Sequence, residues 1–390
     1  MKIIIKMNIL LTDILFPNKY AKWRLVEIKS FIDEYKCDIL VVNKITNYAG
    51  IKYDFDYEIL KEKFSLEEYD ILIFNKNYNF VNKYNSRLDG TQFNNIINAD
   101  YMFCHKSKNI DISIFNLTQL INAYDFIYHI FLISYQKFNH HFKYPHNKQI
   151  IHLYPGGGYL SPASLNNIHK DVNLVITQQF ISKQIKHNKF INVYGGGFYN
   201  KDENIKIKNK KTDELCVCFT SMGCPIAKGL YIYYSIVEQY NIKYPNNNVK
   251  FISIGINKNT NKNIVSYKPM PQDELSNFYN NNVDIVISLD TGVQINGFPL
   301  GVEAIMEGCV VLTTDKHNQN VLNEFNLDPF YIIDVDNIDD IIIRINSLTD
   351  KNILLEKSNI LQNRIYELFN YDNTILKTFN FIKSLNENNL

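Results

Sequence analysis

Short apolar runs alternate with amphipathic stretches from one end of this chain to the other. Runs such as Asp38–Val42, Val249–Ile254 and Val283–Leu289 have the length and composition of buried strands. Stretches such as Trp23–Tyr35 place their apolar residues on one helical face. Buried strands that alternate with helices are typical of parallel sheets covered on both faces. The pattern therefore predicts an α/β fold with doubly wound sheets.

A polar segment interrupts the alternation near the middle of the chain. Asn200–Asp213 carries five lysines, and the alternation restarts at Glu214. We interpret this segment as a solvated linker. The length of 390 residues suits two or three domains, and we predict an N-terminal domain over residues 1–199 and a C-terminal domain over residues 200–372. Within the first, Asn116–Phe142 is predicted to be helical, in two pieces.

The charge balance and the apolar runs exclude two classes of protein. Lys and Arg total 41 and Asp and Glu total 40, so the chain has a net charge of +1. A near-neutral chain lacks the field that holds nucleic acid, so we expect no nucleic-acid partner. No apolar run reaches the roughly 18 residues of a membrane span. Peripheral contact with a membrane stays open.

The six cysteines lack the spacing of a metal site. Cys216 and Cys218 alternate within one apolar run, and no Cys-x-x-Cys pair occurs. We expect free, buried thiols in a reducing compartment, and therefore a cytoplasmic location.

Two predicted loops of the C-terminal half follow strands and precede helices, where phosphate groups commonly bind. In Thr220–Gly229, which includes Ser221 and Gly223, Lys228 stands at a helix entrance and could neutralise a diphosphate. The alternative is a solvated lysine. In Asn296–Ala304, Gly297 permits close approach of the backbone and Pro299 suits a first helical turn.

Glu303 follows one turn later, among small and apolar neighbours. A carboxylate in such surroundings needs hydrogen-bond donors, and a ribose diol provides them. The alternative is a glutamate on the exposed face of a helix. Another strand end, Ser266–Met270 with Tyr267 and Lys268, offers backbone groups that could bind a base edge.

These segments together resemble a known family. Gly297–Asp315, with its Gly-Phe-Pro-Leu-Gly-Val-Glu-Ala-Ile-Met run, and Lys228-Gly229 resemble the donor half of GT-B glycosyltransferases, most closely the retaining enzymes of glycosyltransferase family four. Asp273–Asp315 carries most of the match. The resemblance covers roughly residues 173–380, while the first 170 residues match only in their alternation.

The resemblance implies two doubly wound Rossmann-like domains that face across a cleft. It also implies transfer of a sugar from a nucleotide-sugar to a glycan or other hydroxyl acceptor, with retention of configuration. Lys228 would bind the diphosphate and Glu303 the ribose. The turn Gly297–Leu300, with Phe298 and Pro299, would offer backbone amides to the phosphates. Ser221, Gly223, Tyr267 and Lys268 complete the predicted donor site.

The N-terminal half contributes a triple glycine and a histidine. Gly156, Gly157 and Gly158 follow the predicted strand Gln149–Leu153 and could admit an acceptor to backbone N–H groups. The family often places a histidine near this point, touching the sugar, so His152 joins Lys228 and Glu303 as a predicted catalytic residue. The alternative for His152 is a satisfied core histidine.

Neither half suggests a metal or a cofactor. No Asp-x-Asp ends a predicted strand, and His140, His141 and His146 lack an acidic residue at useful spacing. We therefore expect no metal and no cofactor, with the nucleotide-sugar acting as substrate.

The end of the chain is predicted to be helical, with a kink or break at Tyr371–Asn373. The resemblance implies that residues 373–390 form a helix that crosses back to the N-terminal domain.

Three departures from the family pattern support other functions. Thr220–Ala227 contains no arginine, Gln294–Asn296 offers no second glutamate, and Thr12–Lys22 contains no glycine. The missing arginine and the missing second glutamate favour an inactive or weakly active GT-B binding or scaffold protein. A nucleotide-sugar epimerase or a phosphorylase of the same architecture is a further alternative.

Overall fold

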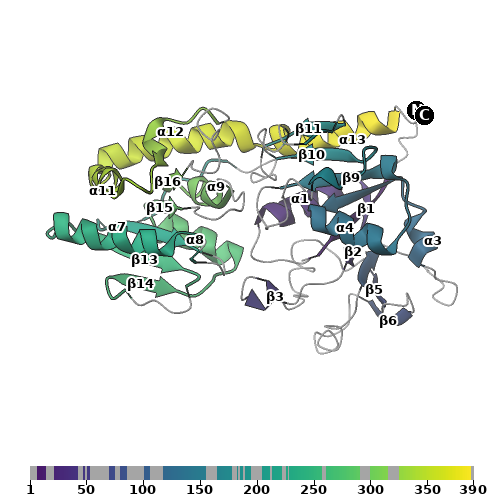
Figure 1. Cartoon of the computed structure of the whole chain (residues 1–390), viewed down its shortest axis with the longest axis horizontal. Helices are drawn as coiled ribbons and strands as arrows, with labels where there is room; N and C mark the ends of the chain where they lie inside the picture. The colour runs from purple at the N-terminus through teal and green to yellow at the C-terminus, as the bar shows by residue number, and fades with distance from the viewer. Residues whose placement is uncertain are drawn as a thin grey trace. The chain divides into compact units, whose positions relative to one another are not determined.

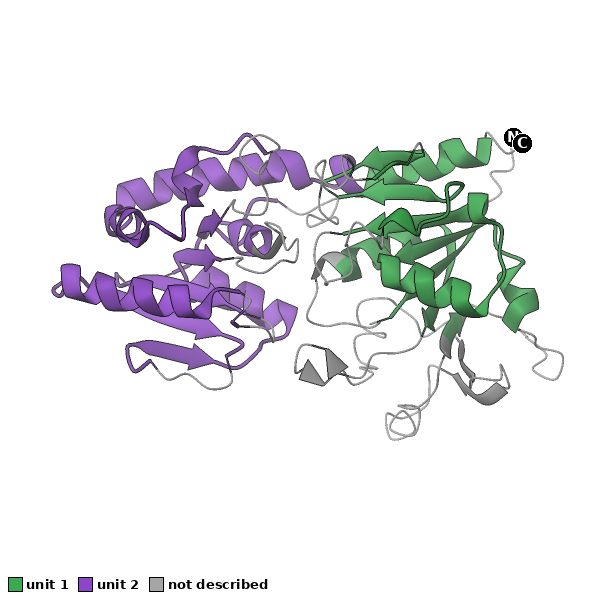
Figure 2. Ribbon diagram, viewed as in Figure 1, with its two compact units in different colours: residues 1–154, 159–196, 375–390 green, residues 155–158, 197–374 purple. Residues whose placement is uncertain are grey.

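The computed structural model divides the chain into two compact units (Figure 2). Unit 1 comprises residues 1–154, 159–196 and 375–390, and unit 2 comprises residues 155–158 and 197–374. The structure describes residues 7–14, 22–42, 47–48, 51–52, 70–74, 80–85, 101–105, 117–154, 165–177, 182, 185–187, 189–194, 204–210, 213–221, 225–226, 228–256, 261–289, 299–314 and 325–387.

Unit 1 is built on a nine-stranded sheet in the order β11-β10-β9-β8-β1-β2-β7-β5-β6 (Figure 1). Strands β11 to β2 in this order are parallel, whereas β7, β5 and β6 extend the sheet with antiparallel pairing. The strands are β1 (Asn8–Asp13), β2 (Lys36–Val42), β5 (Asp70–Phe74), β6 (Phe80–Asn85), β7 (Tyr101–His105), β8 (Phe126–Ile130), β9 (Gln149–Leu153), β10 (Asn173–Ile176) and β11 (Phe190–Asn192). The other elements are α1 (Lys22–Glu34), α3 (Leu117–Ile121), α4 (Leu132–His141), η4 (His146–Lys148), α13 (Lys377–Glu387) and the two-stranded sheet of β3 (Asn47–Tyr48) and β4 (Ile51–Lys52).

The predicted helical stretch Asn116–Phe142 is wrong at its centre, where β8 lies between α3 and α4. Strand β8 pairs with β1 on one side and β9 on the other, and all five of its residues are buried. Aromatic and β-branched residues suit such a central strand. Its one polar residue, His129, is satisfied by Thr12 Oγ1 at 2.7 Å and Gln149 Oε1 at 2.9 Å.

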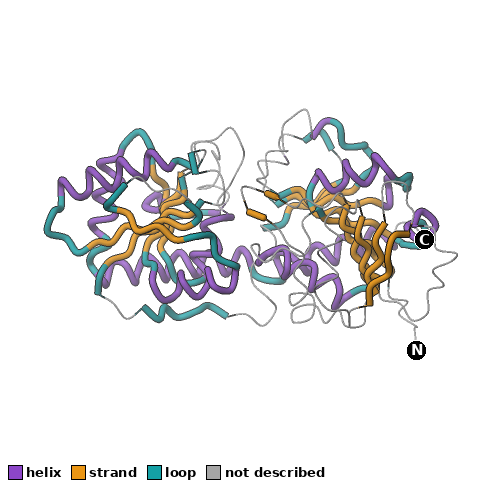
Figure 3. Tube along the Cα trace, turned by 90° about the horizontal axis from the view of Figure 1, so that it is seen from below, coloured by secondary structure: helices purple, strands orange, loops and turns teal. Residues whose placement is uncertain are grey.

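Unit 2 is built on a six-stranded sheet in which all pairs are parallel, in the order β14-β13-β12-β15-β16-β17. Figure 3 shows helices on both faces of the sheet, as the alternating pattern predicted. The elements are β12 (Leu215–Thr220), α7 (Leu230–Lys243), β13 (Val249–Ile254), β14 (Ile264–Tyr267), α8 (Gln272–Asn282), β15 (Ile285–Ser288), α9 (Pro299–Met306), β16 (Val310–Thr314), η5 (Pro329–Tyr331), β17 (Ile332–Ile333), α11 (Ile338–Ser347) and α12 (Lys351–Phe369).

The strand order of unit 2 reverses at β12, which lies between β13 and β15. In open α/β sheets, ligands bind beyond the carboxyl ends of the strands at such a switch point. Helix α9 is held close to this edge, because a Cβ on Gly301 would lie only 2.9 Å from Val311 Cγ1 of β16. A larger residue at Gly301 would push the first turn of α9 away from the sheet.

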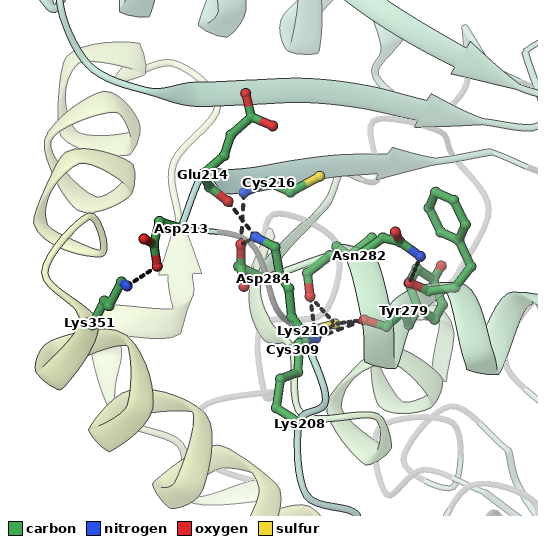
Figure 4. Close-up of polar contacts among 12 residues, drawn as sticks. Lys208, Lys210, Asp213, Glu214, Cys216, Tyr279, Asn282, Asp284, Cys309 and Lys351 are labelled. Carbon is green, nitrogen blue, oxygen red and sulfur yellow. Dashed lines mark hydrogen bonds and ion pairs between the residues drawn. The ribbon is translucent and has the colours of Figure 1, made fainter.

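The lysine-rich segment is not a solvated linker over residues 204–210. Lys206, Lys208 and Lys210 stand at every second position, so in an extended segment they point to one side, while Ile207 between them is exposed. Lys206 pairs with Glu307 at 2.6 Å. Lys208 donates to the carbonyl oxygens of Tyr279 and Val283 (Figure 4). The segment is thereby tied to unit 2.

Lys210 forms a buried ion pair with Asp284, which directly precedes β15 (Figure 4). The side chains are 7% and 8% exposed. The ammonium also donates to the carbonyl of Glu214, and Asp284 accepts from the backbone N–H of Cys216 at 2.8 Å. These contacts join the segment to the amino ends of β12 and β15, away from the carboxyl-end edge.

The chain passes from α12 through a π-helical turn, Asp372–Leu376, into α13. Phe379 of α13 packs edge-on against Phe31 and Tyr35, with ring centroids 5.0 and 5.1 Å away. Lys383 pairs with Glu34 at 2.8 Å. Helix α13 therefore packs on α1 within unit 1.

The five cysteines within the described residues are free and buried. Among those residues, no helix is both long and apolar enough to cross a membrane.

Candidate functional site

The carboxyl-end edge of the unit 2 sheet carries a group of polar side chains at the switch point. Thr220 ends β12, and its Oγ1 lies 2.8 Å from the hydroxyl of Tyr279, which reaches it from α8. Burial raises the pKa of Tyr279 well above its ordinary value, and the charge of Glu303 raises it further. Thr220 and Tyr279 are thus joined by a hydrogen bond, and Glu303 is near enough for its charge to act on Tyr279.

Ser221 and Gln272, among the described residues of unit 2, are buried side chains with unsatisfied polar atoms. Ser221, directly after β12, is 0% exposed, and its Oγ has no hydrogen-bond partner. Gln272, the first residue of α8, is 2% exposed, and neither its Oε1 nor its Nε2 has a partner. An unpaired buried polar group costs about 1–3 kcal/mol, so folding alone does not favour these residues. Both stand toward the carboxyl-end edge of the sheet, where ligands bind in open α/β folds.

Lys228 lies at the entrance of α7 and Glu303 one turn into α9. Lys228 is half-buried and precedes Gly229, whose left-handed backbone (φ 83°) begins α7. Glu303 is half-buried within α9. Because strand carboxyl ends and helix amino ends share one edge of a doubly wound sheet, these residues lie at the same edge as Ser221.

Tyr267 and Lys268 stand at the end of β14, at the same edge. Tyr267 is half-buried and packs against Phe278 of α8, with ring centroids 4.9 Å apart. Lys268 is exposed.

Several predicted residues lie outside what the structure describes. Gly156, Gly157, Gly158, Gly223, Gly297 and Phe298 are outside the described residues. Pro299 and Leu300 form the first turn of α9, but their side chains are not described.

Gln272 and Tyr279 were not predicted as site residues from the sequence, whereas Thr220 lies in the predicted loop Thr220–Gly229. A signal was present in α8, whose buried residues include Gln272, Leu275 and Tyr279 at helical spacing. A glutamine at a core-facing position of an amphipathic helix is unusual, because its buried amide needs hydrogen-bond partners.

His152 lies in unit 1, at the carboxyl end of β9, and is 2% exposed. Its Nδ1 lies 2.5 Å from Glu27 Oε1 and 2.7 Å from the hydroxyl of Tyr128. Its Nε2 has no partner. His152 is therefore a buried histidine with hydrogen-bond partners at Nδ1 and none at Nε2. It is held like a core histidine at one ring nitrogen and has the other available for a ligand.

Glu27 is the centre of this buried group. It accepts hydrogen bonds from the hydroxyls of Tyr128 and Tyr154 as well as facing His152. Burial alone would raise the pKa of Glu27, but His152 and the two tyrosine hydroxyls outweigh it and lower the pKa below its ordinary value. Glu27 is thus a carboxylate that fixes the orientation of the His152 ring.

A second buried ion pair joins Asp13, at the end of β1, to Arg24 of α1. The strand order of unit 1 reverses at β1, between β2 and β8. Phe131 directly follows β8 with a positive φ of 73°, an uncommon conformation for an aromatic residue. The guanidinium of Arg24 lies 4.9 Å from the Phe131 ring centroid. The switch point of unit 1 thus also carries buried charge and a strained backbone.

Two of the described histidines outside this group contact each other. His146 stacks on His169, with ring centroids 4.0 Å apart. Within the described part of the chain, no three His, Cys, Asp or Glu side chains are arranged to hold a metal ion.

Comparison with known proteins finds similarity in structure only. No protein-family model matches the chain, and no curated protein matches it either. A variant of S. aureus TarM, solved with UDP, α-GlcNAc-glycerol and fondaparinux, is 14% identical over 96% of this chain and 99% of its own, with a TM-score of 0.59. HepE from Anabaena, in complex with UDP-glucose, is 13% identical over 97% of this chain and 100% of its own, with a TM-score of 0.58. Sucrose-phosphate synthase from Thermosynechococcus elongatus is 9% identical over 97% and 99%, also with a TM-score of 0.58.

The fold is that of GT-B glycosyltransferases. At these identities the likeness shows the fold alone. The predicted fold class, α/β with two doubly wound Rossmann-like domains, is confirmed.

Proposed function

We propose that this protein is a glycosyltransferase that moves a sugar from a nucleotide-sugar to an acceptor hydroxyl. The observation that carries the proposal is the polar edge of unit 2, where Ser221, Lys228 and Glu303 stand at the switch point of a GT-B fold. HepE, a protein of this fold, binds UDP-glucose.

Lys228 and the amino end of α9 would stabilise the leaving diphosphate. Negative charge develops on the departing phosphates during transfer, and a positioned ammonium and free helix N–H groups favour that charge. The close packing of Gly301 on Val311 would hold the start of α9 in place for this purpose. The backbone N–H groups of Gly297, Phe298 and Leu300 would donate to the phosphates, while Pro299, which has no N–H, would set the first helical turn.

Glu303 would bind the ribose of the nucleotide. Its carboxylate can accept both hydroxyls of the diol, and the Tyr279 hydroxyl, near enough to respond to its charge, would orient it. Tyr267 and Lys268, at the end of β14, would lie beside the base.

The N-terminal half of the chain would bind the acceptor. Gly156–Gly158 would offer backbone N–H groups, and His152 would contact the transferred sugar with its ring held by Glu27. Following the resemblance to family four, we propose retention of configuration, no metal and no cofactor. Free buried thiols support a cytoplasmic location.

One sequence feature favours a second candidate. Thr220–Ala227 contains no arginine to assist Lys228, which supports a GT-B protein that binds nucleotide-sugar without efficient transfer. This candidate predicts binding of the donor and no turnover.

The two candidates separate in one experiment. The purified protein is screened by thermal shift against UDP, ADP, GDP, CDP and common nucleotide-sugars. A ligand at 100 times its dissociation constant should stabilise by about 2.7 kcal/mol. Each donor that binds is then incubated with an acceptor panel in EDTA, and released nucleotide and product anomer are measured by NMR. Binding without release favours the binding protein, and absence of binding would refute both candidates.

A further inference from the structure

Gln272 is the most conspicuous unsatisfied side chain of unit 2. It is 2% exposed, and both ends of its carboxamide lack a hydrogen-bond partner. It occupies the first position of α8, an eleven-residue helix, on the buried face that also carries Leu275 and Tyr279. A methionine of similar size would fill this space without leaving polar atoms unpaired.

The direction of the side chain follows from helix geometry. Side chains tilt toward the amino end of a helix, so the carboxamide extends beyond the start of α8. Tyr279, two turns later on the same face, contacts Thr220 at the last residue of β12. Gln272 stands about 10 Å further along the helix axis. Its amide therefore lies past the strand ends, on the side where ligands bind.

The sheet order places Gln272 apart from the groups proposed to bind phosphate and ribose. Lys228 follows β12, and Glu303 belongs to the helix after β15. Gln272 belongs to the helix after β14, which lies on the other side of β12 in the sheet. A nucleotide with its ribose at Glu303, near Tyr279 of α8, can direct its base along α8 toward Gln272 and the end of β14, where Tyr267 also stands.

We propose that Gln272 is a specificity-determining residue that binds the nucleobase edge of the donor, an assignment that rests on the proposed function. The carboxamide of a glutamine holds an N–H donor group and a carbonyl acceptor side by side. The edge of a nucleobase presents an acceptor and a donor that can pair with them. An ionised diphosphate offers acceptors only, so it would leave Oε1 unpaired. A base satisfies both orphaned atoms at once.

The test compares wild type with Gln272→Met, which is nearly isosteric, by calorimetric titration of UDP, ADP, GDP, CDP and inorganic diphosphate. We expect the preferred nucleoside diphosphate to bind about 10- to 100-fold more weakly to the variant, and inorganic diphosphate to bind equally to both. The melting temperature of the ligand-free variant should equal or exceed that of wild type, since an unpaired amide is removed. As a control, Lys228→Met should weaken binding of diphosphate and nucleotide alike.

Gln272→Glu provides a second test that keeps the shape of the side chain and removes its N–H donors. We expect it to change the order of preference among the four nucleotides. If wild type binds a nucleotide and both Gln272 variants bind it equally well, the assignment is wrong. A lower melting temperature of Gln272→Met with unchanged selectivity would likewise make Gln272 a structural residue. If wild type binds none of the four nucleotides, the proposed function itself fails.

Discussion

The hydroxyl of Tyr279 lies 2.8 Å from Oγ1 of Thr220 and joins the middle of α8 to the last residue of β12. The two residues are 59 positions apart in the sequence. Their contact fixes α8 at the switch point of the unit 2 sheet, next to Glu303, whose charge contributes to the raised pKa of Tyr279. A single hydrogen bond thus fixes α8 to the end of β12, and the Glu303 carboxylate is near enough for its charge to act on Tyr279.

Replacing Tyr279 with Phe removes this link and little else. We expect nucleoside diphosphate to bind roughly 3- to 10-fold more weakly, because Glu303 loses a neighbouring hydroxyl that orients it. Inorganic diphosphate, which has no ribose, should bind unchanged. Titration calorimetry measures both. Tyr231→Phe, which alters an exposed tyrosine of α7, is the matched control and should bind like wild type. Equal losses for both ligands would indicate a displaced α8 instead.

Replacing Glu303 with Gln keeps the shape of the side chain and removes its charge. As an acceptor for the ribose diol, Glu303 should contribute about 1.5–3 kcal/mol to nucleotide binding, the scale of a hydrogen bond to a charged group. The affinity for nucleoside diphosphate should fall accordingly, while that for inorganic diphosphate changes little. If the affinity for nucleoside diphosphate does not change, Glu303 does not bind the ribose and is a carboxylate on the exposed face of its helix.

Replacing Lys210 with Met should destabilise the protein by about 3 kcal/mol, because Asp284 is left buried without its partner cation. The backbone N–H of Cys216 still pairs with Asp284, which keeps the loss at the lower end of the range for broken buried pairs. Urea unfolding measures the change. Lys351→Met is the control, since Lys351 and its partner Asp213 are 69% and 86% exposed (Figure 4). Equal effects of the two substitutions would mean that the Lys210–Asp284 pair is not a structural anchor.

The buried His129 should make stability depend on pH. Burial lowers its pKa from 6.5 to about 3, against a smaller opposing effect of the hydrogen bond to Gln149. Between these values the unfolded chain takes up a proton that the folded chain does not, so stability falls as the pH falls. The loss should approach about 1.4 kcal/mol per pH unit. In urea unfolding between pH 6.5 and 5, the free energy of unfolding of His129→Gln should fall less steeply with decreasing pH than that of wild type. If the free energy of unfolding fell equally with pH in the variant and in wild type, the pH dependence would not come from His129.

Features that depend on local spacing were predictable from the sequence. The alternation of apolar runs with amphipathic stretches determined the α/β class, because a buried strand and a surface helix have different hydrophobic periods. Lys228 was placed at the entrance of a helix, and Glu303 one turn into another, because each predicted helix comes after a strand in the sequence. The cysteines were predicted to be free because none has the sequence spacing of metal ligands, and the described cysteines are free.

Features that depend on distant partners were decided by the tertiary structure. Phe126–Ile130 is a short apolar run that could form a helix or a strand, and only its place between β1 and β9 makes it a strand. Lys210 looked like a linker residue because its partner, Asp284, lies 74 positions away. Glu27 and His152 are 125 positions apart and meet only through the order of the strands. Sequence spacing encodes the period of each element, whereas the partners of a buried polar group are set by which elements the sheet brings together.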